Sequence, residues 1–197
     1  NACRMDWNVV CPHEKDEEVF VFGNPPYLGS KLQSKEQKED LEFVCKSEKR
    51  YKDLDYISCW FFLSCKYIKG NQVKVAFVTT NSITQGEQVP MLWPVIYEND
   101  IEIFFTHTSF KWSNNAKYQA GVSCAIIGLQ NKQNGDKTIY TNNIKKIVPS
   151  INPYLTAGSN TIVMGSFEPM QGFPIMEVKN MTYDGGFLIL AEVVLEK

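Results

Sequence analysis

Four consecutive residues, Asn24-Pro25-Pro26-Tyr27, combine hydrogen-bond acceptors with an aromatic ring directly after an apolar run, Glu18–Gly23. The apolar run predicts a buried strand. The two prolines fix two φ angles and remove two backbone donors, so the turn is stiff and displays its carbonyl oxygens. Asn24 precedes a proline and is therefore biased toward an extended conformation. Such a turn cannot continue a sheet, but it offers a good set of hydrogen-bond acceptors.

The ligand that suits this turn is a planar aromatic amine, because an exocyclic amino group carries two N–H donors. The Asn24 side-chain oxygen would accept one N–H and the Pro25 carbonyl the other, which draws the nitrogen lone pair out of conjugation and makes it a better nucleophile. Tyr27 would lie against the ring, where stacking on a base is worth about 1–3 kcal/mol. This is the chemistry of amino-group methylation by a sulfonium donor. The alternative is a rigid turn without chemistry.

The pattern around the turn predicts an α/β fold, because strands alternate with helices. The last two strands are joined by a loop alone, which is typical of an antiparallel pair. We expect a polar loop over 81–89 and an edge strand over 138–148. Pro94 lies inside a predicted short helix and should kink or end it. The other expected elements are an apolar helix over 54–70, a parallel strand over 72–80, a short helix over 90–99 and strands over 100–110 and 120–130.

Candidate binding residues gather where these strands end. In open parallel sheets, ligands bind beyond the carboxyl ends of the strands. Asn24–Tyr27 follows the first strand, Asn81 and Ser82 follow the second, and Phe110 and Trp112 close the third. This set can accept hydrogen bonds and stack on a ring. It contains no convincing nucleophile, no histidine–carboxylate pair and no glycine-rich phosphate loop.

The composition excludes other classes of function. A net charge of -2 argues against a self-sufficient nucleic-acid binder. The six cysteines lack C-x-x-C spacing and only two histidines are present, so we expect no metal site. No apolar run is long enough to span a bilayer and no signal peptide is visible, which predicts a cytoplasmic protein with reduced cysteines. The charged stretch 31–53 predicts a solvated helix or loop, with a mobile flap near a substrate as the alternative.

Several separated segments resemble one family. "NPPY" after an apolar strand resembles motif IV of amino-group methyltransferases that use S-adenosylmethionine. "FGNPPYLGSK", "DLDYISCWF", "FVTTNSITQGEQVPMLWP", "IEIFFTHTSFKWSNNAK" and "INPYL" together resemble the methyltransferase part of bacterial type IIG/IIL fused restriction–modification enzymes, which are DNA adenine-N6 methyltransferases. The resemblance covers about residues 1–155. It implies the C-terminal half of a Rossmann-like class I methyltransferase sheet, with parallel strands ending in an antiparallel pair.

The resemblance also implies roles for individual residues. Asn24, Pro25, Pro26 and Tyr27 would be the catalytic motif. Asp6 in "RMDW" matches the acidic position that contacts the cofactor's adenine, although it could equally be a helix or turn cap. Phe110 matches an aromatic that stacks on the flipped base, with Trp112 as a second candidate and a core position as the alternative.

One departure from the family concerns the cofactor. The glycine-rich cofactor loop and the acidic residue that holds the cofactor ribose are absent. We therefore expect residues 1–147 to be the catalytic-motif half of the domain and 148–197 a connector toward a target-recognition domain. S-adenosylmethionine and double-stranded DNA would be bound by the longer parent protein, largely through other parts of it, while this fragment alone would be inactive.

Two alternatives to a DNA enzyme stay open. A protein glutamine amide or an rRNA guanine also presents an N–H₂ group to Asn24 and Pro25, so the motif alone does not decide. The charged stretch 31–53 and "GEQVPMLWP" favour the DNA enzyme. The other alternative is that the fragment is an inert scaffold or interaction module.

Overall fold

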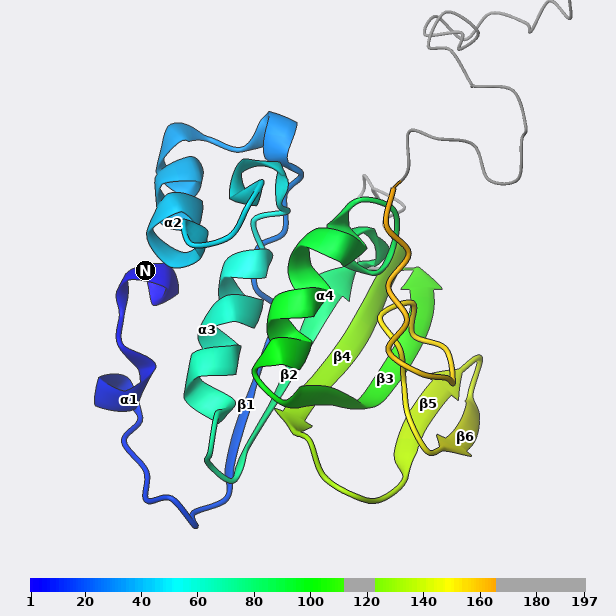
Figure 1. Ribbon diagram of the computed structural model, residues 1–197. Coiled ribbons are helices and arrows are strands. Elements are labelled where there is room, and N and C mark those ends of the chain that lie inside the picture. Colours follow the sequence, from blue (N-terminus) through cyan, green and yellow to red (C-terminus); the bar gives the residue numbers. More distant parts are fainter. Residues whose placement is uncertain (112–122, 166–197) are drawn as a thin grey trace, which may run out of the picture. The chain divides into compact units, whose positions relative to one another are not determined.

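The strands of the described residues join one mixed sheet in the order β1-β2-β4-β3-β5-β6 (Figure 1). The computed structural model describes residues 1–111 and 123–165. The strands are β1 (Val19–Gly23), β2 (Val73–Thr80), β3 (Ile101–Lys111), β4 (Ser123–Asn131), β5 (Lys137–Thr141) and β6 (Ile144–Val148). The α-helices are α1 (Trp7–Val10), α2 (Lys35–Cys45), α3 (Ser58–Ile68) and α4 (Gln88–Glu98). Short 3-10 helices are η1 (Ala2–Arg4), η2 (Ser30–Leu32), η3 (Tyr51–Asp53) and η4 (Asn81–Thr84).

The pairing places several strand ends at one edge. β1 and β2 are parallel, and β4 runs antiparallel to both β2 and β3. β3 therefore points the same way as β1 and β2, and β5 is parallel to β3. We call the edge where β1, β2, β3 and β5 end the C-terminal edge. The predicted combination of parallel strands with an antiparallel pair is confirmed.

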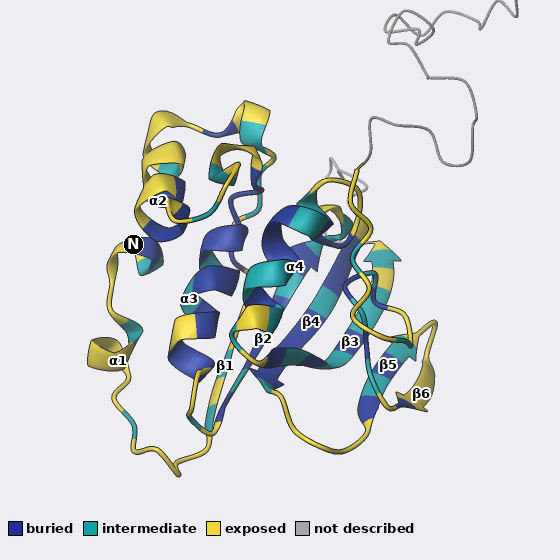
Figure 2. Cartoon of the chain, in the orientation of Figure 1, coloured by how far each residue is buried: buried dark blue, intermediate teal, exposed yellow. Residues whose placement is uncertain are grey.

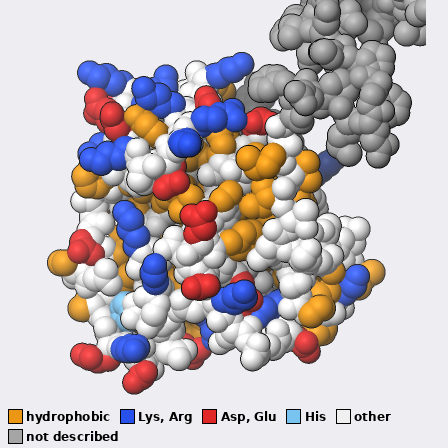
Figure 3. All heavy atoms as spheres, viewed as in Figure 1, with side chains coloured by type: hydrophobic (Ala, Val, Ile, Leu, Met, Phe, Trp, Pro, Cys, Tyr) orange, Lys and Arg blue, Asp and Glu red, His pale blue; other side chains and the backbone are white. Residues whose placement is uncertain are grey.

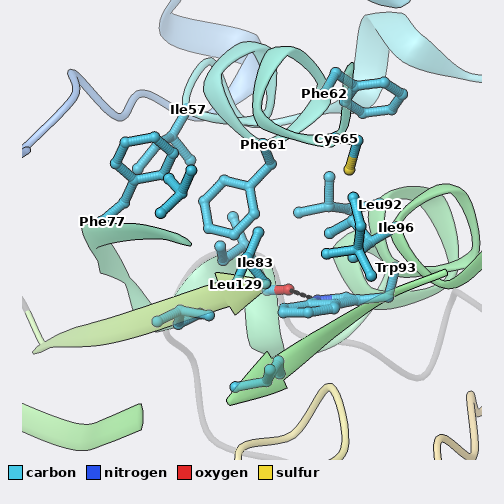
Figure 4. Packing of buried hydrophobic residues seen from close by; sticks show 14 of the residues in the cluster. Ile57, Phe61, Phe62, Cys65, Phe77, Ile83, Leu92, Trp93, Ile96 and Leu129 are labelled. Atoms are coloured by element: carbon cyan, nitrogen blue, oxygen red, sulfur yellow. Dashed lines mark hydrogen bonds between the residues drawn. The ribbon is translucent and has the colours of Figure 1, made fainter. Parts of the chain in front are cut away.

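The hydrophobic core lies between the sheet and helices α3 and α4 (Figure 2). Along β2, buried residues alternate with half-buried ones, so one face is packed against the helices. Phe61 of α3 sits edge-on to Phe77 of β2 and to Trp93 of α4, with ring centroids 5.7 and 6.2 Å apart (Figure 4). The Trp93 indole N–H donates to the Ile83 carbonyl at 2.7 Å. This bond satisfies the one polar atom of a side chain that is otherwise held by apolar contacts.

The first strand forms where it is expected, but the expectation that it is buried is wrong. β1 lies at the edge of the sheet, and its Phe20 and Phe22 are 60% and 83% exposed.

Two further local expectations differ from the structure. Of the two outcomes expected at Pro94, an end of the helix is wrong, because α4 runs through Pro94 to Glu98, and a kink stays a prediction. The first part of the expected polar loop is η4, whose Ile83 and Thr84 are buried. Both outcomes follow from packing, because the apolar side chains of α4 and η4 bury against the sheet and outweigh the missing proline donor.

The expected edge strand over 138–148 is instead the hairpin of β5 and β6. Asn142 and Asn143 both have positive φ, 49° and 64°. Two such residues in a row form the tight turn whose twist matches an antiparallel pair, and asparagine tolerates this conformation better than most residues.

Helix α2 accounts for part of the charged stretch. Ser34 and Gln37 form a capping box at its start. Leu41, Val44 and Cys45 are buried on one side together with the Asp40 carboxylate, while the other charged residues of α2 face solvent as predicted for a solvated helix. Acidic and basic side chains are interspersed over the face that carries the helices (Figure 3).

The compact unit to which these elements belong runs from Asn1 to Met164. The division expected at residue 147 stays a prediction. None of the helices within 1–111 and 123–165 is long and apolar enough to cross a membrane.

Candidate active site

The Asn24–Tyr27 turn leaves the sheet at the C-terminal edge, directly after β1 ends at Gly23. Asn24 is exposed, Pro25 is buried and Tyr27 is half-buried. No hydrogen bond among the described residues uses the Asn24 side chain or the Pro25 carbonyl. Within the described part of the chain, both acceptors are therefore unused.

Tyr27 connects the turn to the next strands of the sheet. Its hydroxyl lies beside the Cys124 thiol at the start of β4, and burial followed by this neighbour raises the pKa of Tyr27. Cys124 in turn pairs with Thr80 of β2 and with Phe110 of β3. The turn after β1 and the end of β3 therefore approach each other across the first residues of β4.

Phe110 lies near the end of β3 and is half-buried, not a member of the hydrophobic core. The His107 ring stands edge-on to it, with the two centroids 5.3 Å apart. Its position at the C-terminal edge is the one expected for a base-stacking residue, and that role stays a prediction. Trp112 lies outside the described residues.

Asp55 is a member of the site that the sequence pattern does not reveal. The sequence indicates only a carboxylate near the start of an apolar helix. In the structure Asp55 is 5% exposed, and its Oδ1 accepts the backbone N–H groups of Leu28 at 2.9 Å and Ile57 at 3.2 Å. Its Oδ2 accepts the Ser82 hydroxyl at 3.3 Å. One carboxylate thus joins the residue after Tyr27 to the start of α3 and to η4.

Gln33 completes this arrangement. It is buried, and its Nε2 donates to the carbonyls of Leu28 at 2.8 Å and Leu54 at 2.9 Å. The Tyr56 N–H also donates to the Leu28 carbonyl, at 3.0 Å. We call Asp55, Gln33 and Leu28 the Asp55–Gln33 brace. Because both backbone groups of Leu28 are held, the far end of the proline turn has a fixed position.

The residues after β2 reach the end of β3, as the strand-end argument predicts. The Asn81 amide Nδ2 donates to the Ser109 hydroxyl oxygen at 2.7 Å, and Ser109 directly precedes Phe110. Asn81, Ser82 and Phe110 therefore belong to one edge with the proline turn.

Asp6 caps α1, which is the simpler of its two predicted roles. Its Oδ1 accepts the Asn8 backbone N–H at 2.9 Å and the Asn8 side-chain amide at 3.2 Å. The carboxylate is exposed and its Oδ2 has no partner among the described residues. Its neighbours in the chain, Met5 and Trp7, line an apolar cavity of about 210 Å³ together with Val21 and Tyr67. The cofactor role of Asp6 stays a prediction.

No group of three or more histidine, cysteine, aspartate or glutamate side chains within 1–111 and 123–165 is arranged to hold a metal ion.

Comparison with known proteins gives a consistent set of matches. Residues 1–141 match the family model described as MmeI, DNA-methyltransferase domain. The chain is 47% identical over 192 residues to DNA methyltransferase A of Bacillus subtilis (strain 168), which covers 96% of this chain and 22% of that protein. It is similar to the structure of the type IIL restriction–modification enzyme MmeI in complex with DNA, with 39% identity and a TM-score of 0.82 over 88% of this chain and 24% of that one. The chain thus spans less than a quarter of either relative.

Proposed function

This chain belongs to the family of MmeI DNA-methyltransferase domains, and on that premise we propose that it carries the amino-group acceptor of a DNA adenine-N6 methyltransferase. The family predicted from the separated segments is confirmed, and so is a partial Rossmann-like methyltransferase sheet. The observation that carries the proposal is the pair of unused acceptors on a stiff turn, the Asn24 side-chain oxygen and the Pro25 carbonyl, beside the half-buried Tyr27.

The two acceptors act on the amino nitrogen. Each accepts one N–H of the N6 group, so the nitrogen lone pair is directed away from the ring and toward the methyl donor. The brace at Leu28 limits the movement of the turn, which places the acceptors before the substrate arrives. An adenine must leave the duplex to reach this edge, and Tyr27 and Phe110 offer aromatic surface for its two faces.

S-adenosylmethionine is the proposed donor and supplies an activated methyl group with a neutral thioether as leaving group. The residues present fit the cofactor's adenine: an apolar cavity receives a ring, and the neighbouring Asp6 carboxylate has an unpartnered oxygen for an amino group. Met5, Trp7 and Val21 would contact the ring, and Asp6 would accept its N–H.

The partner and setting follow from the relatives. MmeI is described as a type IIL restriction–modification enzyme and was solved in complex with DNA. We propose that the whole protein to which this chain belongs binds double-stranded DNA and methylates it within a restriction–modification system.

Nucleoside analysis tests the proposal. The whole protein is incubated with duplex DNA and isotopically labelled S-adenosylmethionine, and the DNA is digested to nucleosides for mass spectrometry. We expect label in N6-methyladenine and none in an Asn24→Ala variant purified in parallel. Label in another nucleoside, or label only in added ribosomal RNA or protein, would contradict the assignment.

A further inference from the structure

A second cavity, of about 580 Å³, opens at the C-terminal edge on the β3 side of the candidate active site. We call it the hydroxyl groove. Its walls come from η4, β3, the hairpin of β5 and β6, and the turn 151–157. Ser109 lines it and directly precedes Phe110 in β3, so the groove and the position proposed for the target base both lie at the end of this strand. The donor side chains of the groove that the proposal uses are Ser109, Lys146 and Tyr154.

The groove differs in its charge from three other cavities of the described chain. No aspartate or glutamate lines it, and its one charged residue is Lys146. Those three cavities each include a carboxylate, for example Glu102, Asp16 and Glu39. Lys146 forms no ion pair with any residue in 1–111 or 123–165. The charge inside the groove is therefore suited to an anion.

The hydroxyl groups of the groove have hydrogen atoms to donate. The Ser109 oxygen accepts the Asn81 amide at 2.7 Å, and the Tyr154 oxygen accepts the Val163 N–H at 2.9 Å. A hydroxyl that accepts one bond still has its own O–H to donate, and no described residue takes either one. The Ser109 and Tyr154 hydroxyls and the Lys146 ammonium together form a set of hydrogen-bond donors, and no carboxylate among the residues that line the groove competes for them.

The wall that carries Tyr154 is held in place by Asn152. The Asn152 Oδ1 accepts the N–H groups of Tyr154 at 3.0 Å and Thr156 at 3.2 Å, and also the Thr156 hydroxyl at 3.0 Å. The Asn152 N–H donates to the Thr156 carbonyl. A turn fixed by so many local bonds loses little entropy when a ligand binds.

We propose that the hydroxyl groove binds a phosphate of the DNA backbone next to the target nucleotide. The proposal rests on the proposed function, because it takes DNA as the substrate. A phosphodiester is an anion whose oxygens only accept hydrogen bonds, which matches a cation and hydroxyl donors without a carboxylate. Such a contact fixes the register of the strand whose base enters the site.

A matched pair of lysines tests the proposal in the whole protein. Lys146 lines the groove, whereas its neighbour Lys145 does not, and successive side chains of a strand point to opposite faces. We expect Lys146→Ala to weaken binding of duplex DNA about threefold to tenfold and to lower the salt dependence of binding by about one phosphate contact. Lys145→Ala, which removes the same charge, should change affinity by less than about twofold. Equal effects of both variants, or an unchanged salt slope for Lys146→Ala, would overturn the assignment.

The phosphate itself is identified with DNA in which single phosphates near the target adenine are replaced by neutral methylphosphonate. One such replacement should weaken binding to the wild-type protein and have no further effect on Lys146→Ala, since the partner charge is already gone. If the loss of affinity from each phosphate replacement simply adds to the loss from Lys146→Ala at every position, the assignment is overturned, even if the DNA is methylated on adenine. A selective effect at one phosphate, with no N6-methyladenine formed, would instead support the groove and contradict the proposed reaction.

Discussion

Asp55 and Asp40 are two nearly inaccessible carboxylates, 5% and 4% exposed, and each accepts three hydrogen bonds, but their donors lie in different parts of the molecule. Asp55 holds segments that meet at the C-terminal edge, including the residue after the proline turn. Asp40 of α2 accepts the Asn1 amide at 2.7 Å, the Arg4 guanidinium at 2.6 Å and the Tyr56 hydroxyl at 2.8 Å.

The difference shows that burial of a carboxylate does not by itself indicate a functional role. Asp40 joins the N-terminal segment to α2 and α3 and contacts no residue of the proline turn. Asp55 accepts the backbone N–H of Leu28, the residue that follows the proline turn, and the hydroxyl of Ser82 in the segment after β2. We therefore expect substitution of Asp40 to affect stability and substitution of Asp55 to affect turnover.

The largest effect is expected for Asp55→Ala in the whole protein. Loss of the carboxylate frees the Leu28 N–H and lets the turn move, so turnover should fall on the order of 100-fold. Asp55→Asn keeps one oxygen for Leu28 and Ile57 and should retain more than about a tenth of the wild-type rate. Single-turnover methylation with saturating DNA measures both. If the folded fraction of Asp55→Ala methylates at the wild-type rate, the brace does not position the turn.

Asp40→Ala should reduce stability and leave the reaction intact. The Tyr56 hydroxyl loses its buried acceptor, while the half-exposed Arg4 can return to water, so the expected cost is about 2–3 kcal/mol. Calorimetry of the whole protein should show the transition of this domain lowered by about 4–12 °C. Methylation per folded molecule should stay within about twofold of wild type. A selective loss of turnover at unchanged stability would reverse the roles given to the two carboxylates.

Phe110→Ala should act on DNA binding, in contrast to Asp40→Ala, which acts on stability. A half-buried stacking residue should leave unfolding near wild type, but weaken binding to DNA with the target adenine by roughly 1–3 kcal/mol. The loss should be smaller against DNA with an abasic site at that position. Phe61→Ala in the core is the control, because it should cost about 3–5 kcal/mol of stability. A Phe110 variant as unstable as the Phe61 variant would place Phe110 in the core.

The smallest effect is a pH dependence of stability that belongs to Asp40. Burial alone would raise the pKa of Asp40, but hydrogen bonds from Asn1, Arg4 and Tyr56 outweigh it and hold the pKa below its usual range. Because the folded-state pKa lies below the unfolded one, Asp40 stabilises the fold above the unfolded pKa of about 3.9, and this contribution is lost as the pH falls through the folded-state pKa. The difference in unfolding free energy between wild type and Asp40→Asn should thus be constant near neutral pH and shrink below about pH 4. A difference that grows in acid would contradict this.

Local pattern predicts much of the fold and the centre of the site. The apolar helix α3, the strand β2 and the antiparallel pair of β3 and β4 follow from periodicity and connection length. The stiff turn at Asn24 follows from residue types whose backbone preferences are independent of the rest of the chain. The hairpin at Asn142 also has a local signal, two adjacent residues that tolerate positive φ, which the expectation of a single strand overlooks.

Contacts between distant residues could not be predicted in this way. Asp55 and Leu28 are 27 positions apart, and Asp40 is 36 positions from Arg4. Whether a carboxylate near a helix start caps its own helix or holds another segment depends on tertiary packing, which a single sequence does not specify. The hydroxyl groove likewise exists only because the hairpin and the turn 151–157 come together beside β3.

The most direct test of the account is Asn24→Ala in the whole protein, measured as single-turnover methylation and as DNA affinity. Asn24 is exposed and its side chain forms no hydrogen bond within the described residues, so the variant should fold normally. Asn134→Ala, an exposed asparagine in the loop between β4 and β5, is the control and should behave as wild type. We predict that Asn24→Ala lowers the methylation rate at least about 100-fold, as expected for loss of an acceptor needed in the transition state. Its affinity for DNA should stay within about threefold of wild type. Methylation within about threefold of wild type, a loss under roughly 1 kcal/mol, would contradict it.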